Sequence, residues 1–315
     1  MIKKRERSLE LDQLQALYRR MHKDNTKREN VYSDLIRKKT EIKGLNAIDF
    51  PLQFIKNEAI ILHDIRLQDK FGHFQMDFIL LNPKCIVILE VKNWYGTILF
   101  KEIDQVIRIN DNGEQEGFPN PITQAKLQQY RLRKWLHKHG YTNILVQYLV
   151  VISFPHTIVQ VDPNFKGSME KVIHSNQLVF KWNNRMNTLP PNGCSQNVKD
   201  LTQLLIHSHT PPDNNMMEKY HVHNGELVKG MFCFKCELPT MVKKYNKWVC
   251  QKCKDESFSA HLENINDYKL LLGHIASNKQ LRNFLAVDCI HVMKRMIKNA
   301  GFEPIGTGRM RKYLL

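Results

Sequence analysis

The sequence predicts an α/β protein with a mixed sheet flanked by helices, followed by a small cysteine module and a helical C-terminal domain. Three observations support this prediction. Strand-like segments follow one another from Ile60, a helix-like and a further apolar segment come next, and two cysteine pairs lie beyond residue 230. Strands followed by a helix and another strand are typical of a compact α/β core.

The first 56 residues are expected to be mainly helical. Apolar side chains recur at helical spacing between Leu9 and Lys39, which predicts one or two amphipathic helices. Helix is expected to continue over 44–56, although Pro51 limits its length because proline removes a backbone donor.

The strand-like segments are rich in β-branched and aromatic residues, and they span 59–67, 74–81, 85–93, 96–102 and, more weakly, 105–111. A turn is expected at 111–113 because Asp, Asn and Gly favour turns. A helix is expected to begin at Pro121 and to end at Gly140, and residues 144–153 are apolar enough for an interior strand.

The remainder is expected to contain shorter strands, including 171–180, and a helix near Asn197–His207. The segment HTPPDNN at 209–215 is a linker signal. Together these features predict five parts: an N-terminal helical segment, a core domain, an extension with a linker, a cysteine module and a C-terminal domain, at 1–39, 40–155, 156–215, 216–260 and 261–315.

The chain of 315 residues carries a formal net charge of +16, with a pI near 9.5. A strongly basic protein favours a polyanionic partner, and nucleic acid is the commonest one. The alternative is a basic protein that scattered lysines keep soluble.

The sequence has no apolar run near the roughly 20 residues that span a bilayer. Its N-terminus is charged and lacks the apolar stretch of a signal peptide. A cytoplasmic location without a membrane partner is therefore expected, and the oligomeric state stays open.

Charged residues interrupt two apolar strands, at Asp77 in the first and at Glu90 and Lys92 in the second. A buried, unpaired charge costs several kcal/mol, so such residues are expected to be paired, metal-bound or at an open edge. Hard cations such as Mg²⁺ take carboxylate ligands, which makes Asp77 and Glu90 candidate ligands. Lys92 would orient or deprotonate water, or neutralise transition-state charge. The alternative is a solvent-facing Asp and a surface Glu–Lys pair.

The pattern D-x12-E-V-K across a strand, turn and strand resembles the PD-(D/E)xK nuclease superfamily. In detail the chain resembles the nuclease-related domain, NERD, through HDIRL at 63–67, QMD at 75–77, ILEVKNWYGTI at 88–98 and NPITQ at 120–124.

This resemblance implies a restriction-endonuclease-like fold for the core domain. It also implies that Asp77 and Glu90 bind Mg²⁺ or Mn²⁺, with the Val91 carbonyl as a further ligand. Lys92 corresponds to the catalytic lysine, and Gln124 corresponds to a helix glutamine that faces the site.

The chain departs from the family at one position. Similar proteins carry Gly-Glu on an N-terminal helix, whereas this chain has Gly44-Leu45. The acids that would take the place of the missing glutamate are Glu41, Asp49 and Glu58. The departure implies either weak metal binding or a fold retained without catalysis.

Four of the seven cysteines form two C-x2-C pairs separated by 13 residues, namely Cys233, Cys236, Cys250 and Cys253. This spacing predicts a structural Zn²⁺ site of the zinc-ribbon type, with chance clustering or redox use as the alternatives. Trp248 is expected to pack beside the metal, and Cys85 and Cys289 are expected in apolar cores.

The segment beyond residue 262 contains three short helix-like stretches and a glycine-containing hairpin, and it resembles a winged helix-turn-helix. Basic residues on the third helix and on the wing are the candidates for nucleic-acid contact: Lys294, Arg295, Lys298, Arg309, Arg311 and Lys312. The alternative is a packing module with a solvated basic face.

Three functions remain open on sequence grounds. The first is a metal-dependent DNA endonuclease or DNA-processing enzyme targeted by the C-terminal modules. The second is a catalytically impaired DNA-binding protein that keeps the nuclease fold, which the Leu45 departure supports. The third is an interaction or regulatory module whose basic surface binds protein or RNA.

Overall fold

The computed structural model describes residues 2–3, 7–190 and 198–315, without the side chains of Ile2, Lys3 and Arg309. By packing, these residues form two compact units. The first unit contains 39–212 and the N-terminal strand, and the second contains 7–38 and 213–315. The division into five parts stays a prediction.

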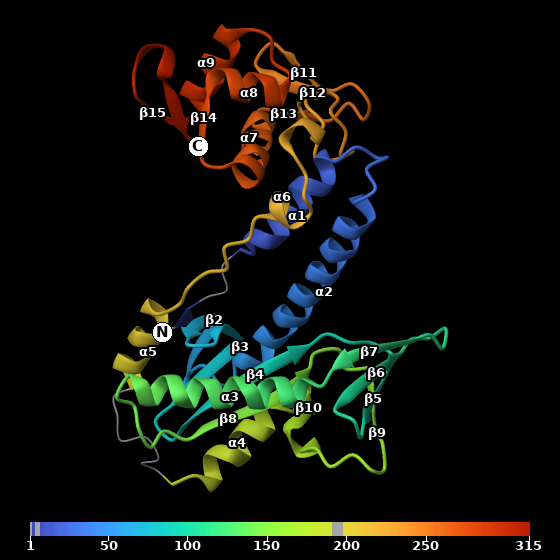
Figure 1. Ribbon diagram of the computed structural model, residues 1–315, viewed down its shortest axis with the longest axis vertical. Helices are drawn as coiled ribbons and strands as arrows, with labels where there is room; N and C mark the ends of the chain where they lie inside the picture. Colours follow the sequence, from blue (N-terminus) through green and yellow to red (C-terminus); the bar gives the residue numbers. More distant parts are fainter. Residues whose placement is uncertain (1, 4–6, 191–197) are drawn as a thin grey trace. The chain divides into compact units, whose positions relative to one another are not determined.

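The first unit is built on a mixed six-stranded sheet of order β1-β2-β3-β4-β8-β10 (Figure 1). Strands β2, β3 and β4 pair antiparallel, whereas β8 pairs parallel to β4, β10 to β8, and β1 to β2. The strands are β1 (Ile2–Lys3), β2 (Ile60–Asp69), β3 (Gly72–Asn82), β4 (Cys85–Lys92), β8 (Val146–Ile152) and β10 (Val172–His174).

Helices cover both faces of this sheet. Helices α3 (Pro121–Lys138) and α5 (Val198–His207) pack on one face, where Ile122, Leu132 and Leu201 join its apolar core. On the other face, the second half of α2 (Arg28–Leu52) and α4 (Leu178–Thr188) share a core that includes Ile48 and Trp182. The mixed α/β fold with flanking helices, expected from sequence, is therefore confirmed.

A second, four-stranded sheet of order β7-β6-β5-β9 follows directly from the first. Strand β5 comes after β4 in the chain and β9 comes after β8, and β5 pairs parallel to β9 as β4 does to β8. Its strands are β5 (Thr97–Lys101), β6 (Gln105–Ile109), β7 (Gln115–Pro119) and β9 (Ile158–Val161). Strand β7 was not expected, since QEGFP lacks an apolar alternation.

The segment 171–180 is only partly a strand, so that prediction was wrong in its second half. Strand β10 ends at His174, and α4 begins at Leu178. Leu178, Trp182 and Met186 are buried at intervals of four, which is helical spacing. The expected helix near Asn197 is α5, although Asn197 itself lies outside the described residues.

The second unit is one apolar core surrounded by short elements. Besides the start of α2, these are α1 (Leu9–Arg20), α6 (Met216–Lys219), β11 (Met241–Lys244), β12 (Lys247–Cys250), β13 (Glu256–Ser257), α7 (Ala260–Leu272), β14 (Ile275–Ser277), α8 (Asn278–Leu285), α9 (Ile290–Asn299), β15 (Glu303–Ile305) and β16 (Lys312–Leu314). In the part of the chain that the structure describes, no helix is both long and apolar enough to cross a bilayer.

A buried ion pair joins the N-terminal helix of this unit to its C-terminal part. Arg20 on α1 is 0% exposed, and its Nε donates to Asp267 Oδ2 on α7 at 2.8 Å. Its Nη2 donates to Asn264 Oδ1 at 2.7 Å, and its guanidinium lies over the Phe232 and Phe284 rings. Burial lowers the pKa of Arg20 to about 10, against the opposing effect of Asp267.

Replacing Arg20 by Ala is expected to destabilise the second unit by about 3–5 kcal/mol, because the change leaves the Asp267 carboxylate buried without its main partner. Amides of α1 and α7 should then exchange hydrogen faster, while peptides of the first unit keep their protection. As a control, Arg7→Ala removes an exposed pair with Asp12 and should have little effect. Equal exchange in wild type and Arg20→Ala would contradict this role.

Candidate functional site

Asp77 lies where the pairing between β3 and β4 ends. The last ladder pair is Phe78 with Leu89, and beyond it the Val91 N–H donates to Asp77 Oδ2 at 2.8 Å. The carboxylate thus replaces a backbone acceptor at the point where the two strands separate. The Asp77 side chain therefore lies where the β3–β4 ladder ends, and this end of the two strands is called the sheet edge below.

The neighbouring strand β2 is irregular at the same level. Asp64 has a φ of +54°, and the β2–β3 ladder has no pair between His63↔Phe78 and Ile65↔Met76. A non-glycine residue in the left-handed region is uncommon and often marks a functional site. The Asp64 carboxylate accepts a short hydrogen bond from Gln75 Nε2, so the irregularity is held in place.

Glu90 is a buried carboxylate, only 2% exposed, on the face of β4 that α3 covers. Its Oε1 accepts from Lys92 Nζ at 2.7 Å, and its Oε2 accepts from Gln128 Nε2 at 2.8 Å. The same Gln128 nitrogen also donates to the Gln75 carbonyl at 3.0 Å. Both oxygens are therefore satisfied, which is the condition for burying a carboxylate.

The motif NPITQ positions Gln124 at the start of α3. Asn120 caps the helix, since its Oδ1 accepts from the Ile122 N–H at 2.9 Å, and Pro121 occupies the first turn. Asn120 also donates to Asp104 Oδ1 at 2.9 Å, which fixes the cap. One turn later, Gln124 Oε1 accepts from Lys92 Nζ at 3.0 Å.

Helix α2 reaches the same edge at Gly44. A Cβ there would lie 2.3 Å from the Asn93 Cβ, so only glycine permits this close approach. Asn93 Nδ2 donates to the Thr40 carbonyl at 2.9 Å, which ties the helix to the residue after Lys92.

Position 45, where related domains have glutamate, holds no acid here, and the two candidate acids that follow it have other surroundings. Leu45 is buried in the core on the opposite face of the sheet, together with Ile48. Glu58 accepts from Trp182 Nε1 at 2.8 Å, which gives it a packing role, and Asp49 is a half-buried residue of α2.

Glu41, one helical turn before Leu45, is the acid of α2 whose charge acts on Asp77. Burial and the Glu90 carboxylate raise the pKa of Asp77 well above its ordinary value, and Glu41 raises it further. The Val91 N–H and the Lys92 ammonium oppose this shift. An excess of negative charge therefore gathers at Asp77.

These groups fit a hard divalent cation. Asp77 and Glu90 supply carboxylate oxygens, and the gathered negative charge would be relieved by a cation. The Lys92 carbonyl accepts from the Ser153 N–H on the β8 side, so the preceding Val91 carbonyl points towards β3 and Asp77. The Val91 carbonyl oxygen thus lies on the same side of β4 as Asp77.

Three of the four predicted catalytic residues, Glu90, Lys92 and Gln124, form one hydrogen-bonded group. Asp77 accepts from the backbone N–H of Val91, the residue between Glu90 and Lys92. Sequence reasoning missed Gln128 and left Glu41 unassigned. Gln128 follows Gln124 by four residues, so helical spacing would have placed it on a neighbouring part of α3.

The mixed sheet and these side chains agree with the nuclease-like pattern that the sequence indicated. Residues 38–153 match the family model described as the nuclease-related domain, NERD. The matched segment makes up about a third of the chain, and its similarity to nuclease-related domains suggests a divalent metal and an interaction with nucleic acid. Neither the curated proteins nor the solved structures contain a match.

The four paired cysteines come together in the second unit. Their sulfurs all lie within 4.8 Å of one another, with Cys233 Sγ 3.6 Å from Cys253 Sγ and Cys236 Sγ 3.7 Å from Cys250 Sγ. A zinc tetrahedron with bonds of about 2.3 Å has sulfur–sulfur edges of about 3.8 Å. The cluster is therefore able to hold one zinc ion, with no coordination position left for water.

The surroundings of the cluster affect the thiols differently. Burial raises the pKa of the Cys233 thiol to about 12. At Cys250, burial also acts upward, but hydrogen bonds from the Thr240 hydroxyl and the Cys253 N–H outweigh it and lower the pKa to about 6. The pKa of Cys250 thus favours one thiolate at neutral pH, and a bound zinc ion would favour thiolates at all four positions.

Two of the three other expectations about cysteines and Trp248 agree with the structure, and one does not. Trp248 is buried in the same core as Cys233 and Cys250, as expected. Cys85 is buried too, but Cys289 is exposed as the N-cap of α9, so its prediction as a core residue was wrong.

Helix α9 is amphipathic, with Met293, Met296 and Ile297 buried. The predicted contact residues Lys294, Arg295 and Lys298 are exposed on its other side. Arg311 and Lys312 are exposed beside the hairpin of β15 and β16, and the side chain of Arg309 lies outside the described residues.

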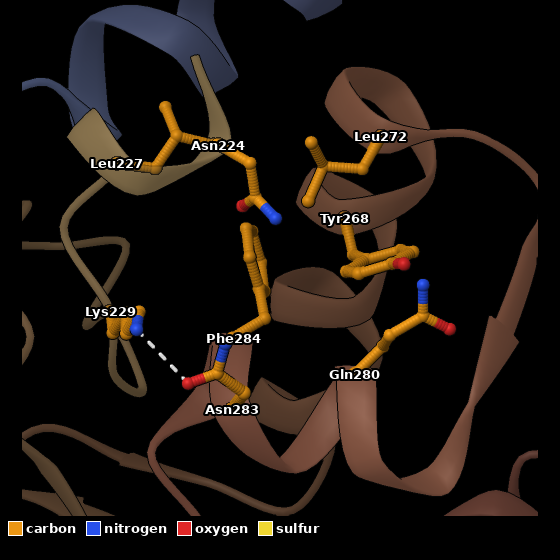
Figure 2. Close-up of a pocket in the computed structure, with 8 residues that line it drawn as sticks. All are labelled: Asn224, Leu227, Lys229, Tyr268, Leu272, Gln280, Asn283 and Phe284. Atoms are coloured by element: carbon orange, nitrogen blue, oxygen red, sulfur yellow. Dashed lines mark hydrogen bonds between the residues drawn. The ribbon is translucent and has the colours of Figure 1, made fainter.

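A small pocket of about 30 Å³ lies in the second unit, and none of the predicted contact residues whose side chains are described lines it (Figure 2). It has room for about one water molecule. Lys229 Nζ donates to Asn283 Oδ1 at 3.0 Å in its wall. The lining residues are Asn224, Leu227, Lys229, Tyr268, Leu272, Gln280, Asn283 and Phe284.

Asp77→Asn is expected to stabilise the metal-free protein as pH rises. The pKa of Asp77 is raised on folding, so wild type loses stability between the ordinary pKa near 3.8 and the raised one. The gain in the free energy of unfolding would be about 1.4 kcal/mol for each pKa unit by which folding raises the pKa of Asp77. Asparagine keeps an oxygen that accepts from the Val91 N–H. Thermal unfolding in EDTA across this pH range measures it.

Asp69→Asn serves as a control of opposite sign. Hydrogen bonds from Arg131 lower the pKa of Asp69, so this variant should lose stability above the ordinary value. If Asp77→Asn instead destabilises the protein at every pH, the site does not hold excess negative charge.

The purified chain is expected to carry one zinc ion, measured by elemental analysis. Cys233→Ser with Cys236→Ser removes two of the four thiolates and should abolish zinc retention. Cys289→Ser changes an exposed cysteine outside the cluster and should leave the zinc content unchanged. Zinc-free wild type, or full retention in the double variant, would refute the assignment.

Proposed function

We propose that the protein is a metal-dependent nuclease or DNA-processing enzyme that hydrolyses phosphodiester bonds. The observation that carries this proposal is the bonded group of Glu90, Lys92 and Gln124, with Asp77 held by the Val91 N–H, within the segment that matches the nuclease-related domain. Two acids, a lysine and a glutamine at one sheet edge are suited to binding a cation and a phosphate together.

Asp77, Glu90 and the Val91 carbonyl would hold Mg²⁺ or Mn²⁺. A cation bound there would lower the pKa of a water molecule and neutralise charge on the phosphate. Glu41, whose charge already acts on Asp77, is the proposed third acid, in place of the glutamate expected at position 45.

Lys92 is proposed to bind the scissile phosphate. An ammonium group has three N–H donors, and Glu90 and Gln124 accept two of those on Lys92. The third can donate to a phosphate oxygen, or to the attacking water. Gln124 and Glu90 would fix the direction of that donor, which is how a positioned charge stabilises a transition state.

The composition of α3 supports a polyanionic substrate beside this edge. The helix carries five lysine and arginine residues and no Asp or Glu. These five are Lys126, Arg131, Arg133, Lys134 and Lys138. Arg131 is held by Asp69, whereas Lys126, Lys134 and Lys138 are exposed. Basic side chains near a scissile phosphate favour approach of nucleic acid.

The second unit is proposed to target DNA. The order α7, β14, α8, α9, β15, β16, with β16 paired to both β14 and β15, supports a winged-helix-like domain. In such a domain Lys294, Arg295 and Lys298 would contact phosphates or bases from α9, and Arg309, Arg311 and Lys312 would do so from the wing. The zinc ribbon would be a structural support.

A second candidate function is a DNA-binding protein that keeps the nuclease fold without catalysis. The observation in its favour is Leu45, which is buried where related domains have glutamate. In this case Glu41, which is exposed, would not complete a metal site.

Cleavage of plasmid and oligonucleotide DNA with Mg²⁺ or Mn²⁺ tests the proposal. Asp77→Ala, Glu90→Ala and Lys92→Ala should each reduce cleavage at least about 100-fold while DNA affinity is kept. Glu41→Gln should raise the metal concentration required, whereas Glu29→Gln, at the other end of α2, should not. Tight DNA binding without metal-dependent cleavage would select the second candidate.

A further inference from the structure

The hairpin of β11 and β12 ends in a tyrosine that the proposed catalytic and targeting roles do not use. Tyr245 is 99% exposed, and with Asn246 it forms the two-residue turn between Lys244 and Lys247. An exposed aromatic residue alone is ordinary. Two further features of this turn make it informative.

The backbone of the turn is unfavourable for tyrosine. Tyr245 has a φ of +54°, the left-handed region, where a side chain with a Cβ is disfavoured. Two-residue hairpin turns usually place Gly, Asn or Asp at such a position. The tyrosine therefore does not serve the stability of the turn, and residues in such an unfavourable backbone conformation cluster at functional sites.

The strand ends next to the turn carry like charges. Lys244 and Lys247 are direct cross-strand partners, an arrangement that is destabilising. Lys247 Nζ is compensated by Glu256 Oε2 at 2.5 Å, and Lys243 lies over the Trp248 ring. The tip thus concentrates positive charge around the exposed ring.

The sequence around the tip has the same bias. Between Glu237 and Asp255 the chain contains five lysines and no acidic residue, and the lysines are Lys243, Lys244, Lys247, Lys252 and Lys254. Such a surface is complementary to a polyanion. Cations around an aromatic ring are the combination that binds single strands, because every unpaired base offers a face for stacking while phosphates meet the cations.

We propose that this tip is a binding site for single-stranded nucleic acid, with Tyr245 stacked on an unpaired base and Lys243 and Lys244 on the flanking phosphates. A duplex hides the base faces, so the tip selects unpaired segments. The inference deepens the proposed function, on which it rests only for the presence of nucleic acid. It requires no cleavage.

Binding is measured in EDTA with Asp77→Asn protein, so that catalysis plays no part. The labelled probes are oligo-dT, oligo-U and an oligomer of abasic sites of equal length. Tyr245→Asn should weaken binding of oligo-dT, oligo-U or both at least about 5-fold and leave the abasic probe unchanged. The two base-bearing probes show whether the tip takes DNA, RNA or either.

Matched variants separate stacking from folding and from charge. Asparagine accepts a positive φ, so Tyr245→Asn should be at least as stable as its parent in thermal unfolding. Tyr245→Trp keeps a stacking surface and should retain binding. Lys244→Gln should weaken the binding of all three probes alike. It should also reduce the slope of log affinity against log salt concentration by about one phosphate contact.

The proposal is overturned if Tyr245→Asn binds oligo-dT and oligo-U as tightly as its parent. It is also overturned if the affinity for the abasic probe falls as much as the affinity for the base-bearing probes. If the parent binds no probe at low salt, the tip is not a site for single-stranded nucleic acid, whereas binding of a duplex DNA probe tests the targeting role of the second unit separately. The cleavage assay on the first unit is independent of that result.

Discussion

The buried carboxylate of Glu90 is the constraint on which the site of the first unit depends. A carboxyl group that is 2% exposed requires hydrogen-bond partners for both oxygens, and here Lys92 and Gln128 supply them. Gln128 Nε2 connects α3 to both strands, because it donates to the Gln75 carbonyl on β3 and to Glu90 on β4. Lys92 on β4 connects to α3 a second time through Gln124. The requirement to pair one carboxylate therefore also fixes the helix that completes the site.

The second unit depends on a comparable buried pair, Arg20 with Asp267, which is 2% exposed. This pair brings the helix near the N-terminus into one core with the cysteine module and the C-terminal helices. The cysteine module and the basic α9 are therefore parts of one folded unit. The proposed targeting role would belong to this unit as a whole.

The sequence was sufficient for features that depend on local pattern. The strands around Asp77 and Glu90, the start of α3 at Pro121 and the cysteine cluster follow from apolar runs, the position of a proline and cysteine spacing. Glu41 could not be assigned, because its proximity to Asp77 depends on how α2 packs at Gly44. The Arg20–Asp267 pair is also outside local pattern, since 247 positions separate its residues.

The central claim is that the edge at Asp77 and Glu90 is a divalent-metal site. Crystals of the chain soaked in Mn²⁺ and measured at the manganese absorption edge test it most directly. The account predicts an anomalous peak bonded to the Asp77 and Glu90 carboxylates and to the Val91 carbonyl. At saturating Mn²⁺, a map without a peak between these two acids would contradict it.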